Sequence, residues 1–173
     1  MGYGSFVYNV VYLLHLMTVI VGFGSVVVAS FLAARAREMD YPQGRVVAQV
    51  AFRMEKALTT GPVVAAGLFG LLLVVLSDEV YKFSQTWISI AFLLYFAVVG
   101  VIIFLVTPNT KAMDQLHGQL ADGSVTASKT AGPPAEVAEL AERSKKAAAF
   151  TGIVHLLWLL LLIDMVWKPG LLG

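Results

Sequence analysis

Two histidines lie inside long apolar runs, and they are the residues of this sequence best suited to chemistry within a membrane. His15 belongs to an uncharged run over 7–34, and His155 belongs to another apolar run over 147–167. An ionisable side chain at such depth is rare, and it usually faces a partner, a cavity or a cofactor. Imidazole is an axial ligand of haem iron, and b-type haem needs no cysteine, a residue this chain lacks. We therefore expect His15 and His155 to be cofactor- and metal-binding residues, with haem b as the cofactor.

Three roles are open for these two histidines. Each ring can form a hydrogen bond between helices, which helps to pack a membrane bundle without any cofactor. Each can ligate the iron of a haem, or another metal, within an apolar sleeve. Each can also relay protons through part of the membrane. The third histidine, His117, lies in a polar stretch, and we do not expect it to be a ligand.

Four apolar segments are available to position the two buried histidines. A helix needs about 20 mostly apolar residues to cross roughly 30 Å of hydrocarbon. The predicted membrane spans are residues 7–34, 57–77, 83–107 and 147–167. We therefore predict an all-α fold, an integral membrane four-helix bundle that forms a single domain over residues 1–173, with the histidines on its first and last spans.

Composition supports the membrane assignment and excludes several classes of function. Hydrophobic residues make up 58% of the chain and charged residues 13%, whereas charged residues form about 25% of a typical soluble domain. The net charge of +1, without a basic run, gives no surface for nucleic acid. A glycine-rich phosphate loop, a nucleophile elbow and a His-Glu-x-x-His helix are absent from the sequence. We therefore assign no catalytic residue.

The segments between and within the spans carry further signals. Pro108 is expected to end the third span, and a polar cytoplasmic loop is expected near 109–135, with one short helix over 111–120. Asp164 and Lys168 stand four residues apart, which predicts an ion pair at the membrane edge. Small residues recur every three or four positions in the first span and predict a face for close helix packing. They are Gly22, Ser25, Ala29 and Ala33.

Basic residues predict the orientation of the bundle. Ten of the twelve lysines and arginines lie between the first two spans or between the last two. Because cytoplasmic loops are enriched in these residues, both termini and the short turn at Asp78 are expected outside the cytoplasm. We expect a multi-pass protein of the bacterial inner (cell) membrane. Counted from the outer helix ends, His15 and His155 lie at similar depths, roughly 13–18 Å from the boundary, where they could face each other.

Three stretches of the sequence match the pattern of a group of bacterial membrane proteins. They are LLHLMTVIVGFGS around His15, RMEKALTTGPVVAAGLFGLLL around Gly61 and Pro62, and IDMVWKPG towards the C-terminal end. With these stretches, the chain resembles a family of predicted integral membrane proteins of unknown function. That family is similar in pattern to the copper-resistance D membrane family and to the haem-linked protoporphyrinogen oxidase family.

These similarities carry expectations about a site. In the protoporphyrinogen oxidase family a histidine of the first helix and a lysine of the third helix are functionally important, and the family is associated with haem b. The resemblance implies the first of these roles for His15. The lysine has no counterpart in the predicted span 83–107, because Lys82 precedes that span. Resemblance to the copper-resistance family implies an association with metal transport.

The function that we predict from the sequence is binding of a b-type haem within the bundle through His15 and His155, for electron transfer or haem metabolism. A non-catalytic accessory or assembly subunit of a larger membrane complex is the competing class. A protoporphyrinogen-oxidase-like enzyme is a second alternative. The expected partners are the lipid bilayer and either other membrane subunits or further copies of the chain, and nucleic acid is not expected.

Overall fold

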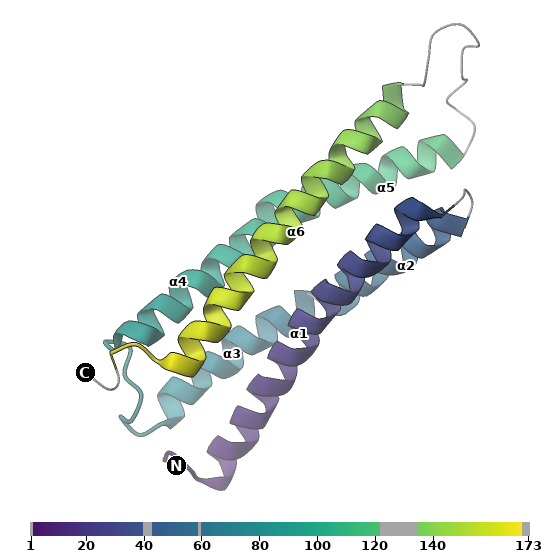
Figure 1. Cartoon of the computed structure of the whole chain (residues 1–173). Coiled ribbons are helices and arrows are strands. Elements are labelled where there is room, and N and C mark those ends of the chain that lie inside the picture. The colour runs from purple at the N-terminus through teal and green to yellow at the C-terminus, as the bar shows by residue number, and fades with distance from the viewer. Residues whose placement is uncertain (1, 40–42, 59, 122–134, 171–173) are drawn as a thin grey trace, which may run out of the picture. The chain divides into compact units, whose positions relative to one another are not determined.

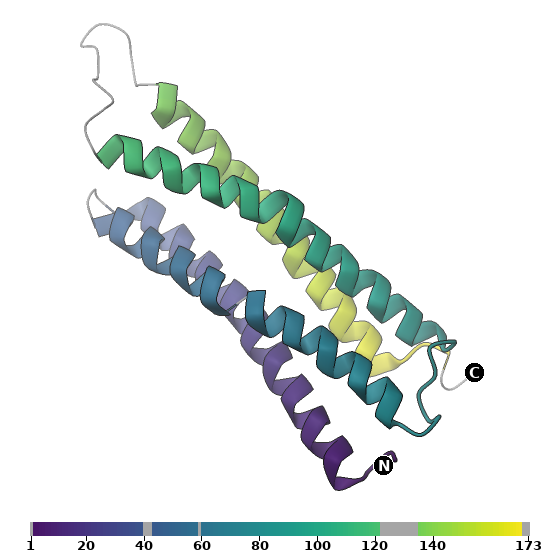
Figure 2. The ribbon, with the colours of Figure 1, turned by 180° about the vertical axis from the view of Figure 1, so that it is seen from behind.

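The computed structural model is all-helical over the residues that it describes, which are 2–39, 43–58, 60–121 and 135–170. Figure 1 shows the helices in chain order, and Figure 2 shows the same ribbon from behind. The elements are α1 (Phe6–Glu38), α2 (Gln43–Leu58), α3 (Thr60–Leu76), α4 (Thr86–Val101), the π-helix η1 (Ile102–Val106), α5 (Thr107–Ala121) and α6 (Ala135–Trp167). The all-α prediction is confirmed.

Three helices are long and apolar enough to cross a membrane. They cover Phe6–Ala36, Thr86–Leu120 and Ala135–Trp167. The first and third of these helices contain the predicted spans 7–34 and 147–167, and the second begins three residues after the start of the predicted span 83–107. The predicted second span corresponds to α3, which is apolar but has only 17 residues. At about 1.5 Å per residue, α3 is about 26 Å long, slightly less than the hydrocarbon thickness. The fold is therefore all-α with three long candidate spans and one shorter apolar helix.

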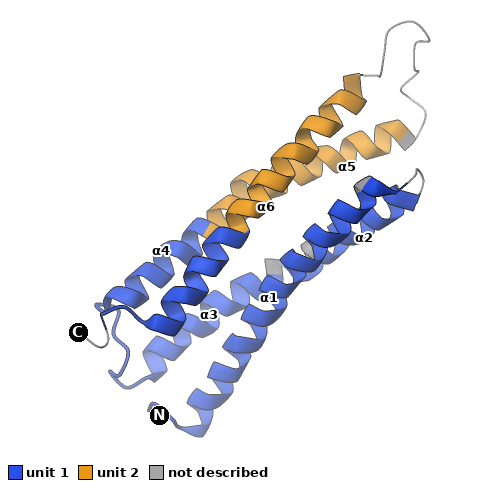
Figure 3. Ribbon diagram, viewed as in Figure 1, with its two compact units in different colours: residues 1–97, 155–173 blue, residues 98–154 orange. Residues whose placement is uncertain are grey.

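The chain forms two compact units, coloured separately in Figure 3. Unit 1 comprises residues 1–97 and 155–173, and unit 2 comprises residues 98–154. Both histidines of the predicted site, His15 and His155, belong to unit 1. The single domain expected over 1–173 stays a prediction.

Three of the four small residues predicted to form a packing face on α1 are buried inside unit 1, and the fourth, Ala33, is half-buried. A Cβ added at Gly22 would lie 3.5 Å from Cβ of Pro62 on α3, an ordinary van der Waals distance. Ser25 and Ala29, on the same stripe, are buried. Because these positions carry little or no side chain, the backbones of α1 and α3 can approach closely.

Four aromatic side chains lie together at one end of unit 1 and hold three segments of the chain together. This terminal aromatic cluster consists of Tyr3, Tyr8, Tyr81 and Trp87. The ring centroid of Tyr81 lies 5.8 Å from that of Tyr3 and 5.3 Å from that of Trp87, both edge-on. Lys168, directly after α6, donates a hydrogen bond from Nζ to the Tyr81 hydroxyl over 3.1 Å. Its Nζ also lies 5.1 Å from the Tyr81 centroid, within cation–π range. The N-terminal segment, the α3–α4 connection and the end of α6 therefore meet at the same end of unit 1.

The ion pair expected between Asp164 and Lys168 is wrong. The Asp164 side chain is buried, and both of its oxygens lack a hydrogen-bond partner within the described parts of the chain. Residues four apart face each other only while the helix continues, and α6 ends at Trp167. Lys168 then adopts a left-handed φ of 45°, which turns the chain away from the helix path, and its ammonium reaches Tyr81 instead.

The helix of the predicted third span does not end at Pro108, as was expected, because it continues through this residue. The end of the membrane span itself stays a prediction. The backbone N–H of Thr107 donates to the carbonyl of Ile102, five residues earlier. The Thr107 hydroxyl donates to the same oxygen over 2.8 Å. This π-turn accommodates a proline, which removes one helical N–H and crowds the preceding turn. α4, η1 and α5 therefore form one continuous helix.

The polar loop expected near 109–135 is partly helical. The short helix expected over 111–120 is confirmed as part of α5, and residues 122–134 lie outside the described residues. Asn109, expected in the loop, is buried in unit 2. Its Nδ2 donates to the backbone carbonyl of Arg143 on α6 over 3.1 Å, so a polar side chain links α5 to α6.

The terminal aromatic cluster predicts an alkaline response. A hydrogen bond with the Tyr81 hydroxyl, and repulsion from that phenol when ionised, raise the pKa of Tyr3 above its ordinary value of about 10. The stability linked to this shift is present below about pH 10 and is lost as the pH rises through the Tyr3 pKa. We expect Tyr81→Phe to lower the pKa of Tyr3, measured by NMR titration of labelled tyrosine. Tyr95→Phe is the control, and an unchanged Tyr3 titration in Tyr81→Phe would contradict the contact.

Candidate functional site

His15 on α1 is held by the backbone of α3. Its Nδ1 lies 2.9 Å from the carbonyl oxygen of Ala66. A carbonyl oxygen can only accept a hydrogen bond, so Nδ1 carries the proton and donates it. In a neutral imidazole the other nitrogen, Nε2, then holds the lone pair that binds metals. The contact with α3 therefore selects the tautomer of His15 that is competent as a ligand through Nε2.

Small residues on α3 make room for the His15 ring. A Cβ added at Gly70 would lie 3.3 Å from Cε1 of the ring, tighter than an ordinary contact. Ala66 itself is buried, with 3% of its surface exposed. The small residues Ala66 and Gly70, four positions apart on α3, thus make room for the histidine ring.

Tyr95 on α4 uses the same stretch of α3 from another helix. Its hydroxyl donates to the carbonyl oxygen of Val63 over 3.3 Å, and its ring packs against Gly67. Sequence reasoning assigned Tyr95 no role, although it is the only ionisable residue in the predicted span 83–107. The acceptor is a backbone carbonyl, and no sequence pattern points to that partner.

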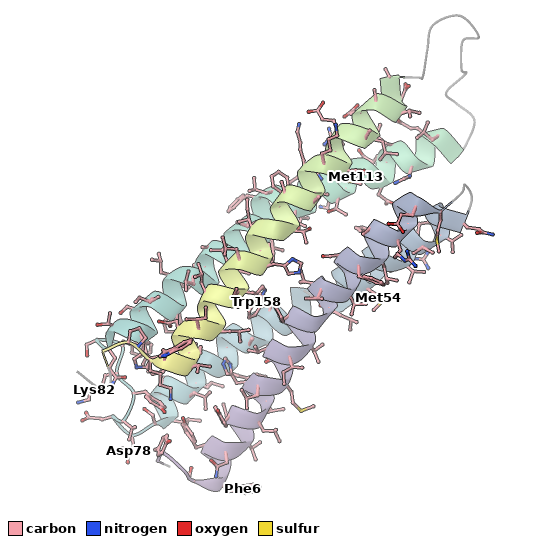
Figure 4. The ribbon with its side chains drawn as sticks, viewed as in Figure 1. Phe6, Met54, Asp78, Lys82, Met113 and Trp158 are labelled. Carbon is pink, nitrogen blue, oxygen red and sulfur yellow. The ribbon has the colours of Figure 1, made fainter. Side chains whose placement is uncertain are left out.

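His155 on α6 has different neighbours. Its ring packs edge-on against Phe23 of α1, with centroids 6.3 Å apart, and Phe23 also contacts Trp158 at 6.1 Å. Figure 4 labels Trp158 on α6. Nε2 of His155 and Nε1 of Trp158 are both buried and have no hydrogen-bond partner among the residues that the structure places. Such atoms are uncommon in folded proteins and call for an unplaced water, ion or ligand.

His15 belongs to α1, and His155 contacts α1 at a different level of that helix. Phe23, the neighbour of His155, follows His15 by eight residues, which is about 12 Å of helix rise. The similar depths of His15 and His155 were estimated from the sequence by counting residues from the helix ends. That estimate assumes that α1 and α6 end at the same level of the membrane. Convergence of His15 and His155 on one iron stays a prediction.

Over the described ranges, no group of three or more His, Cys, Asp or Glu side chains is placed to hold a metal ion. His117 lies on α5 in unit 2, whereas His15 and His155 lie in unit 1. A b-type haem needs only one or two axial histidines, so this finding does not bear on haem binding, which stays a prediction.

Helix length and apolar composition define an all-α, multi-pass integral membrane protein. A family model described as predicted integral membrane protein (DUF2269) matches residues 9–169, nearly the whole chain, including both histidines of unit 1. The chain belongs to this family, whose function is unknown. The resemblance to an integral membrane family of unknown function is thus confirmed. No curated protein and no solved structure matches the chain.

Substitution of His15 separates its packing role from its chemistry. His15→Ala removes the hydrogen bond to Ala66, and membrane hydrogen bonds of this kind average about 0.6 kcal/mol. We expect a loss of about that size in the free energy of unfolding in detergent micelles. His15→Asn keeps an N–H donor near the position of Nδ1 and should lose less. An alanine variant as stable as the wild type would contradict the role of this hydrogen bond.

Gly67 is the position on α3 where a side chain fits least. An added Cβ would overlap the phenol ring of Tyr95, so Gly67→Ala must displace Tyr95 from Val63. We expect the free energy of unfolding to fall by about 1–3 kcal/mol. Gly100→Ala is the matched control, because nothing lies within 4 Å of a Cβ there and alanine favours a helix. Equal losses in both variants would contradict this packing.

Proposed function

We propose that this protein binds a b-type haem inside unit 1, with Nε2 of His15 as an axial ligand. The observation that carries the proposal is the hydrogen bond from Nδ1–H to the Ala66 carbonyl. Histidines that ligate metals almost always donate the other ring N–H to a carbonyl or carboxylate, which holds the tautomer and orients the ring. When bound, the haem would supply one-electron exchange within the membrane.

His155 is the second candidate ligand. Its Nε2 is buried without a hydrogen-bond partner in the described structure, and a bound metal would satisfy that nitrogen. Phe23 and Trp158 contribute apolar and aromatic surface beside it. The separate neighbours of His15 and His155 make two ligand roles testable one at a time.

We further propose four membrane crossings with both termini outside the cytoplasm. The terminal aromatic cluster brings the N-terminal segment and the end of α6 to the same end of unit 1, which favours an even number of crossings. α3 then supplies the fourth crossing beside the three long helices. A span a few ångströms short is accommodated by local thinning of the bilayer at modest cost. The distribution of basic residues supports this orientation, and the bacterial inner membrane is the proposed location.

Two roles follow for a haem in such a site, electron transfer and haem metabolism. A protoporphyrinogen-oxidase-like activity rests on family resemblance alone, and the lysine of that family has no counterpart in the third span. Small residues on a membrane helix favour close docking of a partner helix, which would support the accessory-subunit alternative. Gly22, Ser25 and Ala29 pack within the chain, so they leave no support there for an external partner.

The experiment is a comparison of oxidised and reduced absorption spectra of the detergent-purified protein from haem-replete cells. We expect a Soret band and a sharp reduced α-band, with haem content measured as the pyridine haemochrome. His15→Asn should abolish or shift these bands, because it keeps the donor to Ala66 but has no nitrogen at the position of Nε2. His155→Leu reports whether the second ligand is His155.

The matched variants decide between a ligand and a packing role. If His15→Asn is folded and retains the wild-type spectrum, His15 is not the ligand and the proposal fails in this form. If the gently purified wild-type protein has no haem spectrum at all, haem binding fails, and the accessory-subunit class becomes the better description.

A further inference from the structure

Asp164 is a buried carboxyl group that the proposed haem site does not use. It lies in the last turn of α6, and 5% of its surface is exposed. Neither oxygen has a hydrogen-bond partner in the described residues. The nearest cation along the chain, Lys168, is engaged by the Tyr81 hydroxyl and by the rings of Tyr81 and Trp87.

The surroundings of Asp164 are apolar. It lines a groove of about 420 Å³ between α4 and α6 in unit 1. The other lining residues are Ile90, Leu94, Leu160, Ile163, Trp167 and Pro169. Asp164 is therefore the only titratable residue in the lining, and α4 presents no charged or titratable group to the groove there.

The buried carboxyl group of Asp164 limits what can bind to it. An ionised carboxylate without a partner in an apolar medium is strongly unfavourable, and such a group neutralises instead. A metal cation needs several oxygen ligands, which the apolar lining does not provide. An amine would have to reach oxygens that are buried. A proton needs one oxygen atom and no further protein ligand, and it removes the charge.

We propose that Asp164 is a proton-binding site within the membrane, occupied by a proton at neutral pH. The bound proton makes Asp164 a neutral carboxylic acid, and the adjoining groove gives it an apolar boundary. His155 and Asp164 are nine residues apart on α6, which places them on opposite sides of the helix. His155 faces α1 through Phe23, whereas Asp164 faces α4. The inference is thus independent of the haem proposal.

Infrared spectroscopy of the full-length protein in lipid vesicles tests this inference. We expect the carbonyl stretch of a protonated carboxylic acid at neutral pH, with a shift on deuteration of the acid. Asp164→Asn should remove this band, because asparagine has similar shape but no acid. Asp78→Asn is the control, since Asp78 is an exposed acid of the α3–α4 connection, and it should leave the band unchanged.

If Asp164→Asn does not fold, isotope labelling of the wild-type protein provides a second test. Carbon-13 in the aspartate carboxyl groups of the wild-type protein should shift the same band, which assigns it to an aspartic acid. The absence of a carboxylic acid band from the folded wild-type protein would overturn the inference. A band that persists in folded Asp164→Asn would overturn it as well.

Discussion

The hydrogen bond between His15 and the Ala66 carbonyl is the interaction on which the proposed chemistry of unit 1 depends. A membrane helix satisfies its backbone groups internally, so a polar side chain between helices has few free partners. A backbone carbonyl has a second lone pair, and it can accept from a side chain without giving up its helical bond. Tyr95 uses the same device at Val63. α3 thereby binds polar groups from α1 and α4 through its backbone.

This arrangement explains why α3 is rich in small residues. Gly70 leaves space for the His15 ring, and Gly67 leaves space for Tyr95. A larger residue at either position would separate the helices or displace the polar group from its carbonyl acceptor. α3 thus combines close packing against α1 with two specific hydrogen bonds.

α6 differs from α3 in that several of its buried polar atoms are unsatisfied. His155, Trp158 and Asp164 each bury such atoms without a hydrogen-bond partner in the described structure. His155 and Trp158 contact Phe23 of α1, and Asp164 lies beside α4. Because unpaired buried polar groups are costly, they mark positions where a ligand or proton has most to contribute. Two flanks of one helix therefore carry two separate candidate sites.

The sequence by itself determined the all-helical membrane fold and the place of both histidines in long apolar helices, and of its four predicted spans three correspond to helices long enough to cross a membrane. These follow from apolar length and from the rarity of ionisable residues in such runs, both of which are local properties. The packing face at Gly22, Ser25 and Ala29 was also readable, because its three- and four-residue spacing is the period of a single helix.

Only the tertiary structure decided what each polar group contacts. The acceptors of His15 and Tyr95 are backbone carbonyls, which every residue carries, so sequence cannot distinguish them. The expected ion pair between Asp164 and Lys168 does not form, because α6 ends between the two residues. The helix does not end at Pro108, because the π-turn before it accommodates the proline. Each of these outcomes depends on where a helix ends or on which helix lies beside it, and both are set by packing between distant segments.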